Sequence, residues 1–224
     1  MANLGPGRLT SSVGGPRKAI RLLLTFSIVS AIALAQTGGA AVHQAAKEGD
    51  AVKIKSLLDA GPGLVGARDG AGRTPLITAA FWSQAEPAES SPYLAGIGEY
   101  GEKLQAEYRR PADTAKVLLA AGAAPDARDN EDYTALHWAA MRGNKALIEV
   151  LVAAGAAVDA ADRTFKATPL HLAVRAGHLS AAAALIEAGA DPRLKDTYGR
   201  TPLYYAESSG NAEMAKLLRR RPQR

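Results

Sequence analysis

Apolar and polar positions along most of this chain follow a helical period that short polar segments interrupt. In residues 144–155, NKALIEVLVAAG, the apolar positions recur at helical spacing, which predicts an amphipathic helix. The stretch from Gly155 to the next threonine is polar and rich in turn-forming residues. The same order of helix, glycine and polar turn returns along the chain, which indicates a repeated structural unit.

One apolar run, LLLTFSIVSAIALA at residues 22–35, lacks this alternation. Four basic residues and no acidic residue precede it, and its 14 residues are too few to cross a bilayer, which needs about 20. It ends in Ala33-Leu34-Ala35, the small-x-small pattern of a signal-peptidase site. We therefore expect residues 1–35 to be a signal peptide cleaved after Ala35, and a mature chain without a membrane span in the periplasm. The alternative is an uncleaved membrane anchor, which the short run and the Ala-x-Ala end disfavour.

Two short motifs recur in fixed phase through the rest of the chain. The segment TALHWAA from Thr134 returns as TPLHLAV from Thr168 and as TPLYYA from Thr201, at intervals of 34 and 33 residues. Earlier copies are TPLITAA from Thr74 and the truncated VHQAA at 42–46. The second motif is a Gly-Ala pair that occurs three times. In addition, an aspartate lies five or six residues before each of the four motif threonines. The glycines are Gly122, Gly155 and Gly189, and the aspartates are Asp69, Asp129, Asp162 and Asp196.

These residues resemble the ankyrin repeat, with its T-P-L-H-x-A-A and L-L-x-x-G-A motifs at a period of about 33 residues. The resemblance covers about residues 39–218, and two motifs in fixed phase make it specific. It implies an all-α repeat solenoid, an ankyrin stack of about five helix-turn-helix repeats with hairpin-like turns. The repeats are expected at about 39–68, 69–128, 129–161, 162–195 and 196–218.

Local chemistry supports these units independently of the resemblance. Three motif threonines precede a proline, which is an N-cap residue followed by a residue suited to the first helical position. The motif glycines stand where a helix end needs left-handed backbone. At the far end, Glu207 replaces the alanine of earlier copies, so the fifth repeat is expected to be a C-terminal cap followed by a basic tail at 219–224.

The second repeat contains an insertion. Thr134 to Gly155 spans 21 residues whereas Thr74 to Gly122 spans 48, so 27 residues are extra, and phase matching places them at about 83–109. Insertions in repeat proteins loop out of one face and often take part in binding. A tolerated surface elaboration is equally open. The candidate contact residues in the insertion are Tyr93, Tyr100 and Tyr108.

The sequence shows no catalytic constellation. The absence of cysteine excludes disulfides, thiolate nucleophiles and Cys-ligated metals. His43, His137 and His171 share one repeat position, where the ankyrin resemblance implies bonds to the motif threonine and to an adjoining turn, and such a row is too widely spaced to share one zinc. The G-x-G-x-x-G match at 61–66 follows a predicted helix, so it is not a dinucleotide fingerprint. We therefore expect no enzyme, metal, cofactor or small-molecule substrate; a catalytic site in the insertion is the remaining enzymatic alternative.

The remaining expected function is binding of a partner protein. The resemblance implies a concave surface of turn tips and first helices, with variable contact positions just after the motif aspartate and just after the Ala-Ala pair. Tyr, Trp, Met and Arg, which are enriched at interfaces, are frequent at these positions. Phe81 and the neighbouring Trp138 have inter-repeat packing as an equal alternative, whereas Tyr133, Arg142 and Arg163 are expected to be exposed. The candidate residues are Arg73, Phe81, Trp82, Asn130, Glu131, Tyr133, Met141, Arg142, Arg163, Phe165, Lys166, Arg175, Tyr198 and Arg200.

Charge argues against a nucleic-acid partner once the chain is divided. The whole chain has 27 basic and 22 acidic residues, a net charge of +5. Four of the basic residues lie in residues 1–35 and four in the tail, so residues 36–218 carry 19 basic against 22 acidic side chains. The main hypothesis is an exported adaptor or scaffold. The alternative is an inhibitor or immunity protein that occludes an exported enzyme or toxin, using the insertion and an enlarged turn tip at Phe165.

Overall fold

The computed structural model describes residues 38–84 and 110–219. The predicted signal peptide, the insertion tyrosines Tyr93, Tyr100 and Tyr108, and the tail beyond Arg219 lie outside the described residues. Residues from Gly38 onward form one compact unit, separate from residues 1–37.

The described ranges contain helices and turns and no strand. The first helices of successive repeats are α3 (Pro75–Phe81), α6 (Ala135–Arg142), α8 (Pro169–Ala176) and α10 (Pro202–Ser208). The second helices are α2 (Ala51–Ala60), α7 (Lys145–Ala153), α9 (Leu179–Glu187) and α11 (Ala212–Arg219). Residues 38–48 and 110–120 are also helical, and a short 3₁₀ helix, η1 (Pro62–Gly66), follows α2. The predicted all-α repeat solenoid is confirmed.

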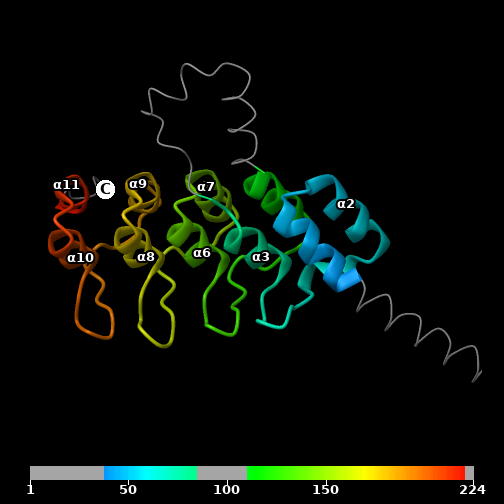
Figure 1. Ribbon diagram of the computed structural model, residues 1–224, viewed down its shortest axis with the longest axis horizontal. Helices are drawn as coiled ribbons and strands as arrows, with labels where there is room; N and C mark the ends of the chain where they lie inside the picture. The colour runs from blue at the N-terminus through cyan, green and yellow to red at the C-terminus, as the bar shows by residue number, and fades with distance from the viewer. Residues whose placement is uncertain (1–37, 85–109, 220–224) are drawn as a thin grey trace, which may run out of the picture. The chain divides into compact units, whose positions relative to one another are not determined.

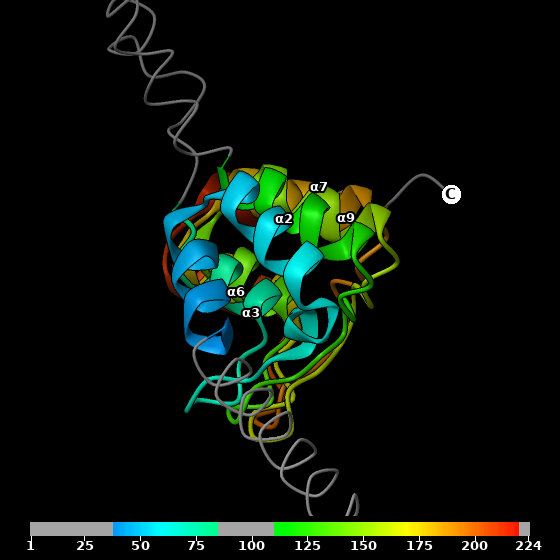
Figure 2. The same cartoon turned by 90° about the vertical axis from the view of Figure 1, so that its right-hand side faces the viewer.

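The helix pairs stack in two layers. Helix α6 packs between α3 and α8, and α8 also contacts α10 (Figure 1). In the second layer α9 packs between α7 and α11. Viewed along the stack, the second helices lie above the first helices and the turns extend below them (Figure 2). The first helices and the turns therefore form one continuous side of the stack.

Motif threonines begin the first helices of repeats two to five, and motif glycines follow the second helices, as the sequence indicates. The Thr74 hydroxyl accepts from the Ile77 amide at the start of α3, and Pro75 takes the first helical position. Gly155 follows α7 with φ +84°, and Gly122 and Gly189 have φ +90° and +95°. The predicted N-caps and left-handed glycines are confirmed, since only glycine adopts such backbone at no steric cost.

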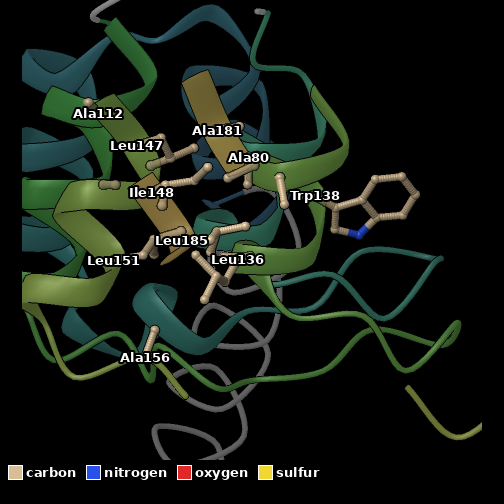
Figure 3. Close-up of a cluster of buried hydrophobic side chains, with 14 of the residues drawn as sticks. Ala80, Ala112, Leu136, Trp138, Leu147, Ile148, Leu151, Ala156, Ala181 and Leu185 are labelled. Atoms are coloured by element: carbon tan, nitrogen blue, oxygen red, sulfur yellow. The ribbon is translucent and has the colours of Figure 1, made fainter. Parts of the chain in front are cut away.

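The core lies between the two layers. Leu147, Ile148 and Leu151 of α7 are fully buried with Leu136 of α6 and Leu185 of α9, and their side chains converge in Figure 3. Burial of each such side chain contributes about 2 kcal/mol to stability. The first helices meet through buried alanines at 80, 139, 140 and 173, whose small side chains let neighbouring helices approach closely.

At the C-terminal end, Glu207 is exposed and accepts from the Arg219 guanidinium at 2.6 Å. No described repeat covers it, as expected of a capping repeat. Arg219 belongs to α11, so the helix extends one residue into the predicted tail. None of the helices in the described ranges has the length and apolar character needed to span a bilayer.

Candidate binding surface

The turn of each repeat is held by its motif aspartate. The Asp69 Oδ1 accepts from the amides of Ala71 and Arg73, both at 2.9 Å. The Asp129 and Asp196 side chains accept from equivalent amides in their own turns. These bonds give the turns of repeats two, three and five the same shape, so the candidate residues that follow these three aspartates lie at equivalent points along the stack.

The turn of repeat four departs from this pattern because it is one residue longer. Asp162 accepts from the amides of Thr164, Phe165 and Ala167 at 2.6 to 2.9 Å. Lys166 adopts φ +51°, which non-glycine residues adopt rarely. The enlarged tip predicted around Phe165 is therefore present and internally hydrogen-bonded.

Backbone hydrogen bonds also join neighbouring turns. The Asn130 amide donates to the Ala71 carbonyl at 3.0 Å, and the Thr197 amide donates to the Phe165 carbonyl at 2.8 Å. Between these pairs, the Arg163 amide donates to the Asp132 carboxylate at 2.9 Å. The turns of repeats two to five are thus connected in series into one edge.

The motif histidines connect neighbouring repeats through hydrogen bonds. His137 bonds the Thr134 hydroxyl through Nδ1 at 2.8 Å and the Ala167 carbonyl through Nε2 at 3.3 Å. His171 makes the equivalent bonds to Thr168 and to the Arg200 carbonyl. Burial is the main cause that lowers the pKa of His137 to about 4, and it lowers the pKa of His171 as well. The rings are neutral at neutral pH and are occupied at both nitrogens.

His43 has the same linking role with a different partner. Its Nδ1 bonds the Thr78 hydroxyl of the next repeat at 2.7 Å, because alanine stands at position 40 where later repeats have the motif threonine. His178 bonds the Met141 carbonyl at 3.1 Å. In the described ranges, no group of three or more His, Asp and Glu side chains is arranged to hold a metal ion.

A first group of aromatic and basic side chains, the α3–α6 cluster, lies on the first-helix side. Phe81 is at its centre, with the Trp138 ring at 4.7 Å and the Trp82 ring at 5.3 Å. The guanidinium of Arg142 lies 5.1 Å from the Phe81 ring. Lys47 lies 4.1 Å from the Trp82 ring, which is 48% exposed. The members are Lys47, Arg73, Phe81, Trp82, Tyr133, Trp138 and Arg142.

Two aromatic residues of this cluster, Trp138 and Tyr133, are partly or largely buried by packing against neighbouring side chains. Trp138 is 7% exposed and its Nε1 donates to the Asp129 carboxylate at 2.8 Å; its ring points away from the aliphatic core in Figure 3. Tyr133 stacks on His137 at 5.4 Å and meets the Trp138 ring edge-on at 5.2 Å. Tyr133 is therefore half-buried, less exposed than the sequence suggested, because His137 stacks on its ring and Trp138 meets it edge-on.

A second group, the α8–α10 cluster, continues the surface. The Arg200 guanidinium lies 5.2 Å from the Tyr198 ring and 5.1 Å from the Tyr204 ring. Arg175 lies 5.4 Å from the Tyr205 ring. Tyr198, Tyr204 and Phe165 are 63%, 47% and 40% exposed. The members are Phe165, Arg175, Tyr198, Arg200, Tyr204 and Tyr205.

Tyr205 and Trp138 occupy equivalent positions and make the same contact. The Tyr205 hydroxyl donates to the Asp196 carboxylate at 2.5 Å, nine residues away, as Trp138 does to Asp129. Lys47, Tyr204 and Tyr205 were not among the predicted contact residues. The available signal for Tyr204 was its departure from the motif, since it stands where three of the four earlier repeats have histidine.

The predicted contact residues differ in exposure. Phe81 and Met141 are half-buried with Arg73 and Tyr133. Four exposed candidates lie on turn tips outside the two clusters: Asn130, Glu131, Arg163 and Lys166. The other exposed candidates, all within the clusters, are Trp82, Arg142, Phe165, Arg175, Tyr198 and Arg200.

Comparison with known proteins agrees with this architecture. The family model described as ankyrin repeats (3 copies) matches residues 104–196 and 161–223, which together span more than half of the chain. A comparison with curated proteins found no match. Ankyrin repeats are generic protein–protein interaction modules. On its motifs, its stacked helix pairs and this match, the chain belongs to the ankyrin-repeat family.

Proposed function

We propose that this chain is an exported, non-catalytic adaptor or scaffold that binds a partner protein through the two clusters on its first-helix side. The observation that carries the proposal is the exposure of three large aromatic side chains along one side, Trp82, Tyr198 and Tyr204. Exposed aromatic groups beside arginine are typical of interface centres, because each can bury a large apolar area while its polar atoms remain bonded.

The rigidity of the surface supports a binding role. Motif aspartates fix each turn, and hydrogen bonds such as that from the Thr197 amide to the Phe165 carbonyl join the turns. A surface that is ordered before binding loses little conformational entropy when the partner arrives. The titratable histidines of the motif are engaged in these links, which supports a non-catalytic role.

Export is proposed from the N-terminal sequence. The basic segment, the apolar run at 22–35 and the Ala-x-Ala end support a cleaved signal. Cell fractionation with N-terminal sequencing tests this. We expect a chain beginning at Gln36 in the periplasmic fraction, and uncleaved chain in the cytosol would overturn the assignment.

Crosslinked capture from the periplasmic fraction tests the binding role. The double variant Trp82→Ser with Tyr204→Ser should lose at least about tenfold of the captured partner, since truncation of interface aromatics costs 2 kcal/mol or more. The matched control is Val52→Ser with Leu179→Ser, which removes exposed apolar side chains from the second helices. Equal recovery by both double variants and the unmodified chain would contradict the proposed surface.

The enlarged turn tip favours a second candidate, an inhibitor or immunity protein that occludes an exported enzyme or toxin. Phe165 is 40% exposed there and stacks on Tyr198 at 6.5 Å, an arrangement that could enter a cleft. Deletion of the gene should then sensitise cells to one exported toxin or hydrolase. The Phe165→Ser variant should fail to restore resistance while the unmodified gene restores it. Absence of sensitisation would exclude this candidate.

A further inference from the structure

Three basic side chains of the two clusters, Lys47, Arg142 and Arg175, contact aromatic rings, whereas Arg73 also pairs with Asp69 in its own turn. Lys47, Arg142 and Arg175 each lie over an aromatic ring, and in the described ranges no carboxylate lies within ion-pair distance of any of them. Elsewhere on the described surface many cations are paired. Examples of such pairs are Lys53 with Glu48, Lys116 with Asp113 and Arg193 with Asp191, at 3.8, 2.9 and 2.9 Å. Lys47, Arg142 and Arg175 are thus held in place by aromatic rings, with no described carboxylate paired with their charge.

The acidic groups closest to this surface are already engaged. Asp129 accepts from Trp138 and from turn amides, and Asp196 accepts from Tyr205 and from turn amides. Asp69 lies 3.4 Å from Arg73 within its own turn. The exposed acids beside the clusters are Glu131, on a turn tip, and Glu48 and Glu207, which pair with Lys53 and Arg219. A carboxylate brought by a partner would therefore meet free guanidinium groups, with which it can form charge-assisted bonds.

The spacing of the repeats sets the spacing of the complementary acids. Arg142, Arg175 and Arg200 belong to repeats three, four and five. Packed helices lie about 8–10 Å apart, and an extended peptide advances about 3.3 Å per residue. One repeat therefore corresponds to about three residues of an extended chain. Trp82 lies between Lys47 and Arg142 in the series of contacts and offers an apolar contact there.

We propose that this surface binds an extended acidic segment of a partner protein, with Asp or Glu about every third residue. The inference rests on the proposed protein-binding function and specifies the chemistry of the partner. A nucleic acid is the less favoured polyanion, because residues 36–218 carry 19 basic against 22 acidic side chains and would repel a ligand with one charge per nucleotide.

Fluorescence anisotropy with the purified full chain tests the proposal. The probes are a labelled peptide of about twelve residues with glutamate at every third position among glycine and serine, the same peptide with glutamine in place of glutamate, and a single-stranded oligonucleotide of equal length. We expect the glutamate peptide to bind at least about tenfold more tightly than the glutamine peptide at low salt, and to weaken as salt rises. Equal binding of the two peptides, or tighter binding of the oligonucleotide, would overturn it.

A pair of charge-neutralising variants locates the interaction. Arg142→Gln with Arg175→Gln should weaken the glutamate peptide about tenfold. Lys55→Gln with Lys216→Gln removes the same charge from exposed positions on the second helices α2 and α11 and should leave affinity within about twofold. All four substituted side chains are exposed. The urea unfolding curves of both double variants should therefore match that of the unmodified chain, which would confirm that both variants fold. An equal loss in both would place the binding elsewhere and contradict the proposal.

The peptide experiment tests the acidic chemistry, and the capture experiment tests the binding role, so their outcomes distinguish the two proposals. If a captured partner depends on Trp82 and Tyr204 but the glutamate peptide shows no preference over glutamine, the acidic chemistry is wrong and the binding role stands. If the glutamate peptide binds through Arg142 and Arg175, the proposed chemistry is supported even where capture recovers nothing. Failure of both experiments overturns both proposals.

Discussion

At the scale of single residues, buried polar groups link one repeat to the next. His137 is fully buried and bonds Thr134 of its own repeat and the Ala167 carbonyl of the following one. Neutral imidazole supplies one donor and one acceptor, and both are used here. Protonation would add a charge to a buried site and remove the acceptor, so the link depends on pH.

The first prediction is a loss of stability between pH 6.5 and about 4. The pKa of His137 is about 4 in the folded protein and 6.5 without burial, so the unfolded chain takes up the proton first as pH falls. Stability is complete above the unfolded pKa and falls by roughly 3 kcal/mol for this residue by pH 4. Burial lowers the pKa of His43 and His171 in the same direction. Urea unfolding from pH 7.5 to 4 measures the free energy of unfolding. This free energy should fall less steeply with pH in the His137→Gln variant than in the unmodified chain. An identical slope in both would exclude His137 as the source of the pH dependence.

The second prediction concerns two buried threonines. Thr114 is fully buried in the helix at 110–120 and its hydroxyl has no hydrogen-bond partner among the described residues, whereas the Thr78 hydroxyl bonds His43. Thr114→Val replaces an unpaired polar group by a methyl group and should stabilise the protein by about 1 kcal/mol. Thr78→Val leaves the His43 nitrogen unpaired and should destabilise it by about 1–2 kcal/mol. Urea unfolding at pH 7 compares them, and destabilisation by both would mean that the Thr114 hydroxyl has a partner.

At the scale of the element, two of the first helices end at a glycine in left-handed backbone. Gly143 ends α6 and Gly177 ends α8, with φ +74° and +78°. A Cβ at 143 would lie 2.5 Å from the His178 ring, while one at 177 would meet no atom within 4 Å. The two positions therefore separate backbone strain from side-chain collision.

Alanine at these two glycines gives the third prediction. Gly177→Ala should cost roughly 1–2 kcal/mol of stability from left-handed backbone alone. Gly143→Ala should cost about twice as much, because it also displaces His178 from the Met141 carbonyl that it bonds at 3.1 Å. Thermal or urea unfolding of the two variants measures the difference. Equal costs would show that the His178 ring moves aside freely.

The elements were predictable where the motif repeats, and the surface was predictable only in part. Threonine caps and glycine ends recur at fixed spacing, so the helices follow from the sequence. The burial of Trp138 and the exposure of Tyr204 do not follow from the motif, because each depends on contacts outside it. Trp138 donates to Asp129 in the turn before its helix, and Tyr204 stands in the last described repeat, where no described ring of a further repeat covers it. Periodicity identifies what repeats share, while the binding surface consists of what they do not share.

At the scale of the whole stack, each described repeat packs only on its neighbours. Helix α6 contacts α3 and α8, and α10 contacts α8 and α11. A middle repeat thus has two interfaces and the last has one. In such an array, stability is approximately a sum of terms for single repeats and for neighbouring pairs, so local opening should begin at an end.

Amide hydrogen exchange tests this last prediction with two fully buried core residues, Leu147 in α7 and Met214 in α11. Protection in the unmodified chain should be highest in α6 to α9 and lower in α10 and α11. Met214→Ala should cost about 2–5 kcal/mol yet speed exchange mainly in α10 and α11, because unfolding of the last repeat breaks one interface only. Leu147→Ala removes support from both sides of a middle repeat and should speed exchange throughout α6 to α11. Uniform acceleration by Met214→Ala would instead mean that the stack opens as a single cooperative unit. The last described repeat could then not open without loss of the whole candidate surface.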